Sequence, residues 1–278
     1  MKTKIKVLIP TDFSVQSDYA YIMVQNLSKK MDLSVTFLHV LSVPDTVTMD
    51  QNGNIQTCGE IDADYVVTQK NVAEKKLKAL ELMHDGDIST DLVLGKLTTS
   101  VLSYAENEQF DLIVMGTKGA SGLSERIAGS EAQVVARKST VPVLTLMCDR
   151  SSFDLGSIVL VHNFKETSNQ EFTLLQDFVD SFGVKVHLLQ ITSDTSSQNK
   201  AAINGYMDQF ASNNGLQSFE KHILHDVDVE NGVIHFNQMN NIDMVCIGTH
   251  GKGGLFHSSA AEALINHMYK PVITFRLK

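Results

Sequence analysis

The segment LIVMGTKG, residues 112–119, is followed ten residues later by Gly129-Ser130. Its apolar part, Leu112–Met115, is typical of a strand that is buried on both faces of a parallel sheet. The strand ends at Gly116, and Gly129-Ser130 comes directly before a predicted helix over residues 131–138. A strand, a loop of small residues and a helix start, in that order, present backbone N–H groups to a phosphate in α/β proteins. This stretch therefore predicts an α/β fold with an anion site.

The same pattern occurs a second time further along the chain. Residues 111–117 (DLIVMGT) match residues 243–249 (DMVCIGT), and residues 7–13 (VLIPTDF) match residues 158–164 (IVLVHNF). Two further pairs of segments match in the same order, namely 35–40 with 186–191 and 141–144 with 270–273. Four segments that recur in order indicate an internal duplication, which predicts a first domain over residues 1–148 and a second over residues 156–278.

Each half alternates short apolar strands with amphipathic helices. In the first half we expect strands at 5–10, 35–41, 88–94, 112–115 and from Pro142 onward, and helices after residue 12 and over 64–84 and 98–108. The alternation predicts two tandem open parallel five-stranded sheets with helices on both faces. Because proline cannot donate to a sheet ladder, the strand that begins at Pro142 is predicted to lie at an edge. Residues 44–61 fit neither element and predict an excursion or a small hairpin.

The composition indicates a globular protein with a sizeable core. The chain has 278 residues, of which 43% are hydrophobic and 20% charged. Its formal net charge of −9 argues against nonspecific binding to nucleic acid or to an anionic membrane. The three cysteines include no CxxC pair, so neither a disulfide framework nor a zinc cage is expected. The ten histidines show no HxxxH or HExxH spacing, so no metal site is predicted.

The hydropathy of the chain predicts its compartment. The amino-terminal residues lack the long apolar region of a signal peptide. No run approaches the roughly 20 apolar residues that are needed to cross a bilayer. We therefore expect a cytoplasmic protein that makes no membrane contact and keeps its cysteines reduced.

Candidate binding residues come directly after the predicted strands. In an open parallel sheet, ligands bind beyond the carboxyl ends of the strands, where the winding reverses. Asp12 follows the first strand, Val40 ends the second, and Gly116 and Gly119 follow the fourth, so these residues converge if the first and fourth strands are neighbours. No GxxxxGK[ST] motif occurs and the first βα turn has no glycine, which excludes a P-loop and a dinucleotide fingerprint.

The spacing Gly116-x2-Gly119-x9-Gly129-Ser130 resembles the nucleotide-binding signature of the universal stress protein family. The turn Pro10-x-Asp12-x-Ser14 and the segment Leu38–Val40 also match that family. The resemblance covers the whole chain except residues 44–61 and the linker. It implies a tandem member of the family, with two Rossmann-like domains of the adenine-nucleotide alpha-hydrolase type.

The resemblance also implies what the residues around the first strand do. Asp12 would contact the adenine or the ribose, close to Pro10. Val40 would hold the adenine through its backbone, and Met115 and Gly116 would line the sugar. The ligand implied is ATP, ADP or AMP.

The same resemblance assigns the phosphates to Gly119, Gly129 and Ser130. A glycine lets the backbone approach a phosphate closely, and free N–H groups at a helix start favour an anion. Ser130 and Gln133 also fit a capping box, which needs no ligand. Glu131 suits the helix dipole but would repel a γ-phosphate unless Mg²⁺ intervenes, so the phosphate number and the role of Mg²⁺ stay open.

The second half departs from the signature. Asn163 replaces Asp12, Ser258 replaces Gly129, and the loop after Gly248 is three residues shorter. We therefore expect the first half to bind the nucleotide in a stress-response protein and the second half to be a degenerate partner. No motif pairs a nucleophile with a base, so no dedicated enzyme is expected. A slow ATPase and an interaction module that binds no nucleotide remain the alternatives.

The resemblance implies an assembly as well. Domains of the family pair through their last strands, which here are Pro142–Met147 and Pro271–Leu277. The fusion would let one chain form this pair internally, as a pseudo-dimer, and further association into a homodimer stays open.

Overall fold

The computed structural model describes residues 4–58, 62–84, 86–117, 127–165, 172–194, 196–249 and 255–276, with the backbone alone for 127–130 and 255–259. The first half contains β1 (Ile5–Pro10), α1 (Val15–Ser28), β2 (Leu33–Leu41), β3 (Val47–Met49), β4 (Ile55–Thr57), α2 (Ala63–Met83), β5 (Ile88–Leu94), α3 (Leu97–Asn107), β6 (Leu112–Gly116), α4 (Ile127–Lys138) and β7 (Val143–Leu146). The second half contains β8 (Ser157–Val161), α5 (Thr173–Phe182), β9 (Lys185–Ile191), α6 (Ser197–Asn213), β10 (Phe219–Leu224), α7 (Val229–Asn240), β11 (Met244–Gly248), α8 (Leu255–His267) and β12 (Val272–Phe275).

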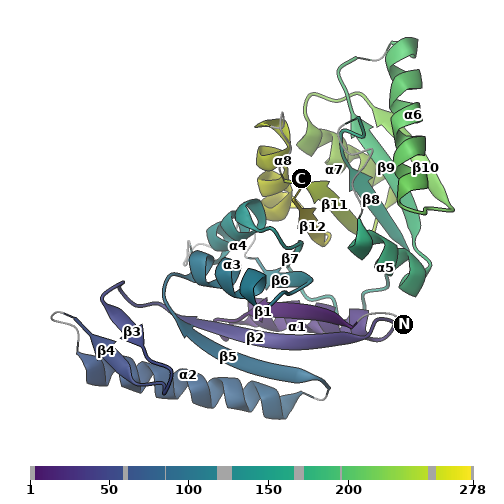
Figure 1. The fold of residues 1–278 in the computed structure, drawn as a ribbon. Helices are drawn as coiled ribbons and strands as arrows, with labels where there is room; N and C mark the ends of the chain where they lie inside the picture. Colours follow the sequence, from purple (N-terminus) through teal and green to yellow (C-terminus); the bar gives the residue numbers. More distant parts are fainter. Residues whose placement is uncertain are drawn as a thin grey trace.

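Ten strands form one continuous sheet, in the order β10-β9-β8-β11-β12-β7-β6-β1-β2-β5 (Figure 1). The five strands within each half are parallel, as the alternation of strands and helices predicts. In the first half β1 lies between β2 and β6, so the winding reverses at β1 and the first and fourth strands are neighbours. In the second half β8 occupies the same place between β9 and β11.

The two halves join through their last strands. The edge position predicted for β7 holds within its own half but not in the whole sheet. β7 is the outer strand of its own five, but β12 pairs with it antiparallel, with Leu144 opposite Ile273. Pro142 precedes β7, and its carbonyl oxygen accepts a hydrogen bond from the Ile113 N–H, 2.9 Å away. At this position Pro142 takes part in the sheet only as an acceptor, so its missing N–H breaks no hydrogen bond there. β7 can therefore lie in the middle of the sheet.

Two hydrophobic clusters cover the two faces of the sheet. One contains residues of α1, α2, α5 and α6, and the other contains residues of α3, α4, α7 and α8 (Figure 1). Along β1, Val7 and Ile9 enter the first cluster and Leu8 enters the second, and all three are fully buried. Because successive side chains of a strand point to opposite faces, burial on both sides explains why β1 is a continuous apolar run.

The predicted elements agree with the observed ones to within a few residues, with one consequence for the binding motif. The helix predicted from residue 131 already includes residues 127–130, so Gly129 and Ser130 belong to α4 instead of preceding it. The segment 44–61 holds the antiparallel hairpin β3–β4. Its turn is closed by Asp50, whose Oδ1 accepts from the N–H groups of Asn52 and Asn54, at 2.8 and 2.9 Å. Among the described residues, none of the helices is both long and apolar enough to cross a membrane.

Candidate functional site

The ends of three adjacent strands carry most of the predicted site. Pro10 is the last residue of β1, Val40 lies one residue before the end of β2, and Met115 and Gly116 end β6. Since β6, β1 and β2 are neighbours and parallel, these residues lie at one edge of the sheet. The side chains of Val40 and Met115 are buried in the same cluster, on the face covered by α3 and α4. Gly119 lies outside the described residues, and of Gly129 and Ser130 only the backbone is described.

The turn after β1 holds Asp12 in an exposed position. Thr11 is buried and its Oγ1 accepts from the Phe13 N–H at 3.0 Å, which supports a left-handed backbone at Phe13 with φ of 61°. The Asp12 Oδ1 accepts from the Ser14 N–H at 3.0 Å. In the second half, Asn163 Oδ1 accepts from the Lys165 N–H at 3.3 Å. Both repeats therefore form this turn with a side-chain oxygen, and they differ in that only the first carries a negative charge.

His39 supports the same turn from β2. Its Nδ1 lies 2.8 Å from the Thr11 carbonyl oxygen, and its ring centroid lies 4.6 Å from that of Phe13. Burial lowers the pKa of His39, although the hydrogen bond to Thr11 and the charge of Asp12 act in the opposite direction. The neutral imidazole therefore stabilises the turn through its contacts with Thr11 and Phe13.

Gly116 is required for packing, whatever binds beside it. A Cβ atom at this position would lie 1.9 Å from the carbonyl oxygen of Gln16, in the first turn of α1. The next residue, Thr117, is also buried, and its N–H donates to the Leu146 carbonyl oxygen at 2.7 Å. Gly116 therefore lets α1 approach the end of β6, and its presence alone does not indicate a ligand.

Glu131 links the starts of two helices. The Thr98 hydroxyl, in the first turn of α3, donates to the Glu131 Oε2, near the start of α4. Both helices follow strand ends at the same edge as Asp12, and helix starts carry partial positive charge. The two helix starts therefore favour an anion at this edge, whereas the carboxylates of Asp12 and Glu131 oppose one.

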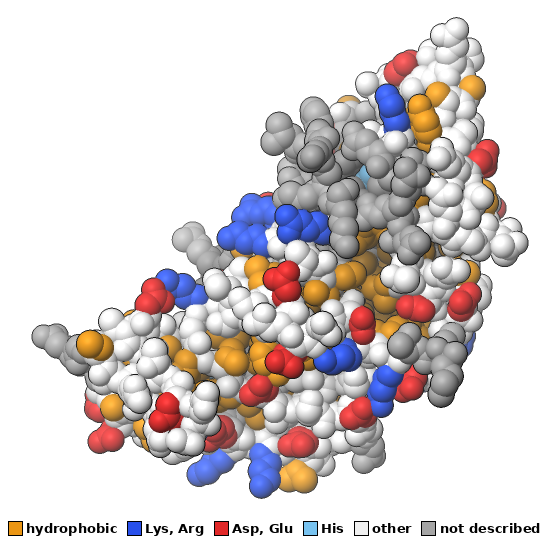
Figure 2. Space-filling view, viewed as in Figure 1, with side chains coloured by type: hydrophobic (Ala, Val, Ile, Leu, Met, Phe, Trp, Pro, Cys, Tyr) orange, Lys and Arg blue, Asp and Glu red, His pale blue; other side chains and the backbone are white. Residues whose placement is uncertain are grey.

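A cavity of about 520 Å³ lies elsewhere, in the hollow between the two halves that Figure 2 shows lined by hydrophobic side chains. Its walls include Ile5 and Pro142, at the amino ends of β1 and β7, together with Phe172 and Phe275 of the second half. Ligands of open parallel sheets bind at the carboxyl ends of the strands. We therefore place the candidate site at the edge with Asp12 and not in this cavity.

A cluster that the sequence analysis missed lies in the second half. His187 of β9 meets Glu220 and His222 of β10, and the three donor atoms lie within 4.8 Å of one another. Burial is the main reason why the pKa values of both imidazoles are lowered. HxxxH and HExxH are helical spacings, whereas Glu220-x-His222 has the period of a strand and places both side chains on one face. That spacing could have indicated a pair of metal ligands on β10, although it does not identify His187 of β9 as the third.

Comparisons with known proteins agree with the duplication. The model of the universal stress protein family matches residues 5–146 and 156–276. A universal stress protein of Methanocaldococcus jannaschii is 30% identical over 141 residues, which are 51% of this chain and 81% of that protein. The universal stress protein YxiE of Bacillus subtilis is 27% identical over 146 residues, or 50% of this chain and 96% of that protein.

Among solved structures, a universal stress protein of Archaeoglobus fulgidus superimposes with a TM-score of 0.69 and 18% identity, over 98% of both chains. At that identity the likeness concerns the fold. It extends over both halves, so the tandem arrangement is shared along the whole length.

Proposed function

Because this chain belongs to the universal stress protein family, we propose that it is a stress-response protein whose first half binds an adenine nucleotide. The observation that carries the proposal is the order β6-β1-β2, which gathers Pro10, Asp12, Val40 and Met115-Gly116 at the reversal of the winding. Asp12 is exposed there and is held by its turn. Its carboxylate is a charged acceptor for the ribose or the adenine amino group.

The phosphates are assigned to Gly119, Gly129 and Ser130. The position of Gly129 and Ser130 at the start of the described part of α4 supports this assignment, because the N–H groups at a helix start favour an anion. Glu131 is the next residue after Ser130, and its carboxylate accepts a hydrogen bond from the Thr98 hydroxyl. We propose that a γ-phosphate near this carboxylate requires Mg²⁺, whereas ADP or AMP does not.

The second half is proposed to be a structural partner that binds no nucleotide. Its turn after β8 keeps the hydrogen bond of Asn163 but lacks the charge of Asp12. We further propose that the two domains, 1–148 and 156–278, form an intramolecular pseudo-dimer. Support comes from the β7–β12 ladder and from an ion pair between α4 and α8, in which Arg137 Nη1 lies 3.0 Å from Glu262 Oε1.

The compartment proposed is the cytoplasm. The three cysteines, Cys58, Cys148 and Cys246, are all free thiols. Disulfides are rare in reducing compartments, which is consistent with this assignment.

Isothermal titration of the full chain with ATP, ADP and AMP, with and without Mg²⁺, tests the binding proposal. We expect one site per chain. Asp12→Asn should keep the turn, as Asn163 does, and remove the charge. Loss of a charged hydrogen bond of about 1.5–3 kcal/mol weakens binding by at least about tenfold.

The duplication supplies the matched controls. Asn163→Asp makes the reciprocal change in the second half and should leave the affinity unchanged. Gly129→Glu places a carboxylate at the proposed phosphate position and should abolish binding, whereas Ser258→Glu at the corresponding place should not. If no nucleotide binds at millimolar concentration, the binding proposal is wrong.

A nucleotide-independent interaction module is the second candidate, and one observation favours it. The contact between Gly116 and Gln16 gives part of the glycine pattern a structural reason of its own. This candidate predicts that neither the wild type nor Gly129→Glu binds a nucleotide at millimolar concentration.

A further inference from the structure

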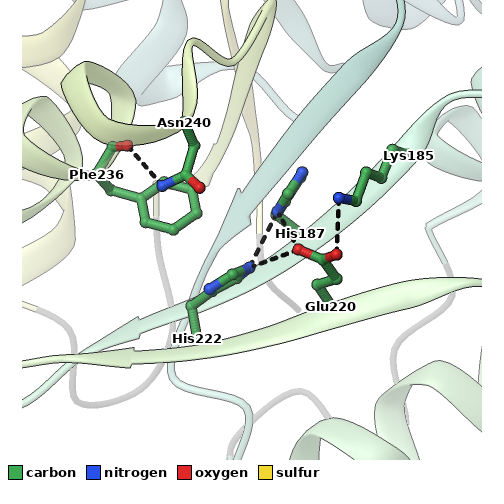
Figure 3. Close-up of polar contacts among 6 residues, drawn as sticks. All are labelled: Lys185, His187, Glu220, His222, Phe236 and Asn240. Atoms are coloured by element: carbon green, nitrogen blue, oxygen red, sulfur yellow. Dashed lines mark hydrogen bonds and ion pairs between the residues drawn. The ribbon is translucent and has the colours of Figure 1, made fainter.

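The outer strands of the second half bring together three side chains that lie far apart in the sequence. Glu220 of β10 is directly opposite His187 of β9, and His222 follows two residues later on β10. All three side chains therefore lie on one face of the sheet. Figure 3 shows them pointing toward one another, with Phe236 of α7 beside them.

The donor atoms are spaced as the ligands of one metal ion are. His187 Nδ1 lies 3.0 Å from His222 Nε2 and 3.5 Å from Glu220 Oε2, and His222 Nε2 lies 3.6 Å from that same oxygen. A circle through three atoms at these separations has a radius of about 2.0 Å, which matches the bond length of about 2.0–2.2 Å that zinc keeps to nitrogen and oxygen ligands. An ion in or near the plane of these three atoms would thus lie at bonding distance from all of them, once the proton shared by the two nitrogens is released.

The contacts around the cluster hold the donors in place. The His187 side chain is only 5% exposed. The Phe236 ring lies edge-on to both imidazoles, with its centroid 4.7 Å from that of His222 and 5.9 Å from that of His187. Lys185 Nζ lies 2.7 Å from Glu220 Oε1, so the lysine orients the carboxylate and leaves Oε2 toward the histidines. Such supporting contacts are typical of ligands that are fixed before the metal binds.

A hydrogen bond between the two histidines explains only part of this geometry. A single N–H accounts for the 3.0 Å between His187 and His222. The Glu220 Oε2, however, lies 3.5 and 3.6 Å from the two nitrogens, beyond the usual hydrogen-bond range of about 2.7–3.2 Å. A cation shared by the three side chains would be bound by the Glu220 Oε2 directly, whereas the hydrogen bond between the histidines does not involve this oxygen.

We propose that His187, Glu220 and His222 form a binding site for a divalent first-row transition-metal ion, with Zn²⁺ as the best match. Imidazole nitrogen and carboxylate oxygen suit zinc, which is usually bound by four ligands. Three protein donors leave the fourth position to water or to another ligand. The site lies on β9 and β10, three strands away from β12 and the junction with the first half, and is independent of the nucleotide proposal.

Titration of the chelator-treated full chain with ZnCl₂ tests the site, with calorimetry for the stoichiometry and Co²⁺ absorption for the coordination. We expect one ion per chain. Glu220→Gln and His222→Gln should each weaken binding by at least about tenfold, because each removes one of three ligands. The Glu220 side chain is 48% exposed, so its substitution by the isosteric amide leaves the fold intact.

His267→Gln is the matched control. His267 Nδ1 also lies close to a carboxylate, 2.8 Å from Glu230 Oε1, but no third donor joins them among the described residues. This variant should bind zinc as the wild type does. Zinc should also raise the unfolding temperature of the wild type and of His267→Gln but not that of Glu220→Gln. Absence of stoichiometric binding, or equal affinity in Glu220→Gln and the wild type, would overturn the proposal.

Discussion

The carbonyl oxygen of Gln16 occupies the space into which any side chain at position 116 would extend. The sequence pattern assigns Gly116 to a nucleotide site, but the same glycine also allows α1 to pack closely against the end of β6. Asp12 and Asn163 are two different residues that form the same turn, and only Asp12 adds a charge, so the turn itself does not need that charge. At the scale of single residues, comparing corresponding positions of the two halves distinguishes residues that the fold requires from residues that a ligand would require.

Gly116→Ala should destabilise the protein. The added methyl group would lie 1.9 Å from backbone that cannot rotate away, and overpacking of this kind costs typically about 1–3 kcal/mol. Gly205→Ala, in the middle of the exposed side of α6, is the matched control because nothing lies within 4 Å of its new Cβ. That change should stabilise the protein by about 0.5–1 kcal/mol. Urea unfolding measures both, and a stable Gly116→Ala protein would refute the packing argument.

His39 should make stability depend on pH. Burial lowers the pKa of His39 below its ordinary value of 6.5, so the unfolded chain takes up the proton first as the pH falls. The free energy of unfolding therefore decreases as the pH drops below 6.5, and this contribution is fully recovered above it. His39→Gln should flatten this part of the curve in urea unfolding between pH 5 and 7.5. An unchanged slope would mean that His39 does not contribute to it.

At the scale of elements, helix starts illustrate what local sequence can and cannot specify. Asp228 caps α7, and its Oδ1 accepts from the Asn231 N–H at 2.8 Å. Ser14 caps α1 without any side-chain hydrogen bond to the helix. The two residues are equally good caps by type, and only the structure distinguishes them.

Asp228→Ala should therefore cost about 1 kcal/mol of stability, because it removes the acceptor of the Asn231 N–H in the first turn of α7. Ser14→Ala should change stability by less than about 0.5 kcal/mol, since no capping bond is lost. Thermal or urea unfolding of the two variants side by side is the measurement. Equal losses in both would contradict the assignment of the cap to Asp228.

At the scale of the whole molecule, the β7–β12 ladder and the α4–α8 contact make ten strands into one sheet. The Gln133 Nε2 donates to the Glu262 carbonyl oxygen at 3.0 Å, next to the ion pair of Arg137 with the Glu262 carboxylate. Each hydrophobic cluster also contains residues of both halves. Each half alone would therefore expose an unpaired strand edge and part of its apolar core.

Polypeptides 1–148 and 156–278, produced separately and mixed, should associate in a 1:1 complex. The driving force is the recovery of the ladder between Val143–Thr145 and Val272–Thr274 together with the burial of apolar surface. Sedimentation velocity of the mixture, with the intact chain as reference, measures the association. Two folded halves that remain apart at micromolar concentration would rule out the pseudo-dimer.

The sequence by itself determined the alternation of strands and helices, the duplication and the strand ends at which Asp12, Val40 and Gly116 lie. These follow from periodicity and from chain order, which are local properties. Only the tertiary structure decided that Gln16 excludes a side chain at position 116, that residues 127–130 are part of α4, and that His187 meets Glu220 and His222. Those contacts depend on strand register and on helix docking, which are set by packing between segments far apart in the chain, and no local pattern records them.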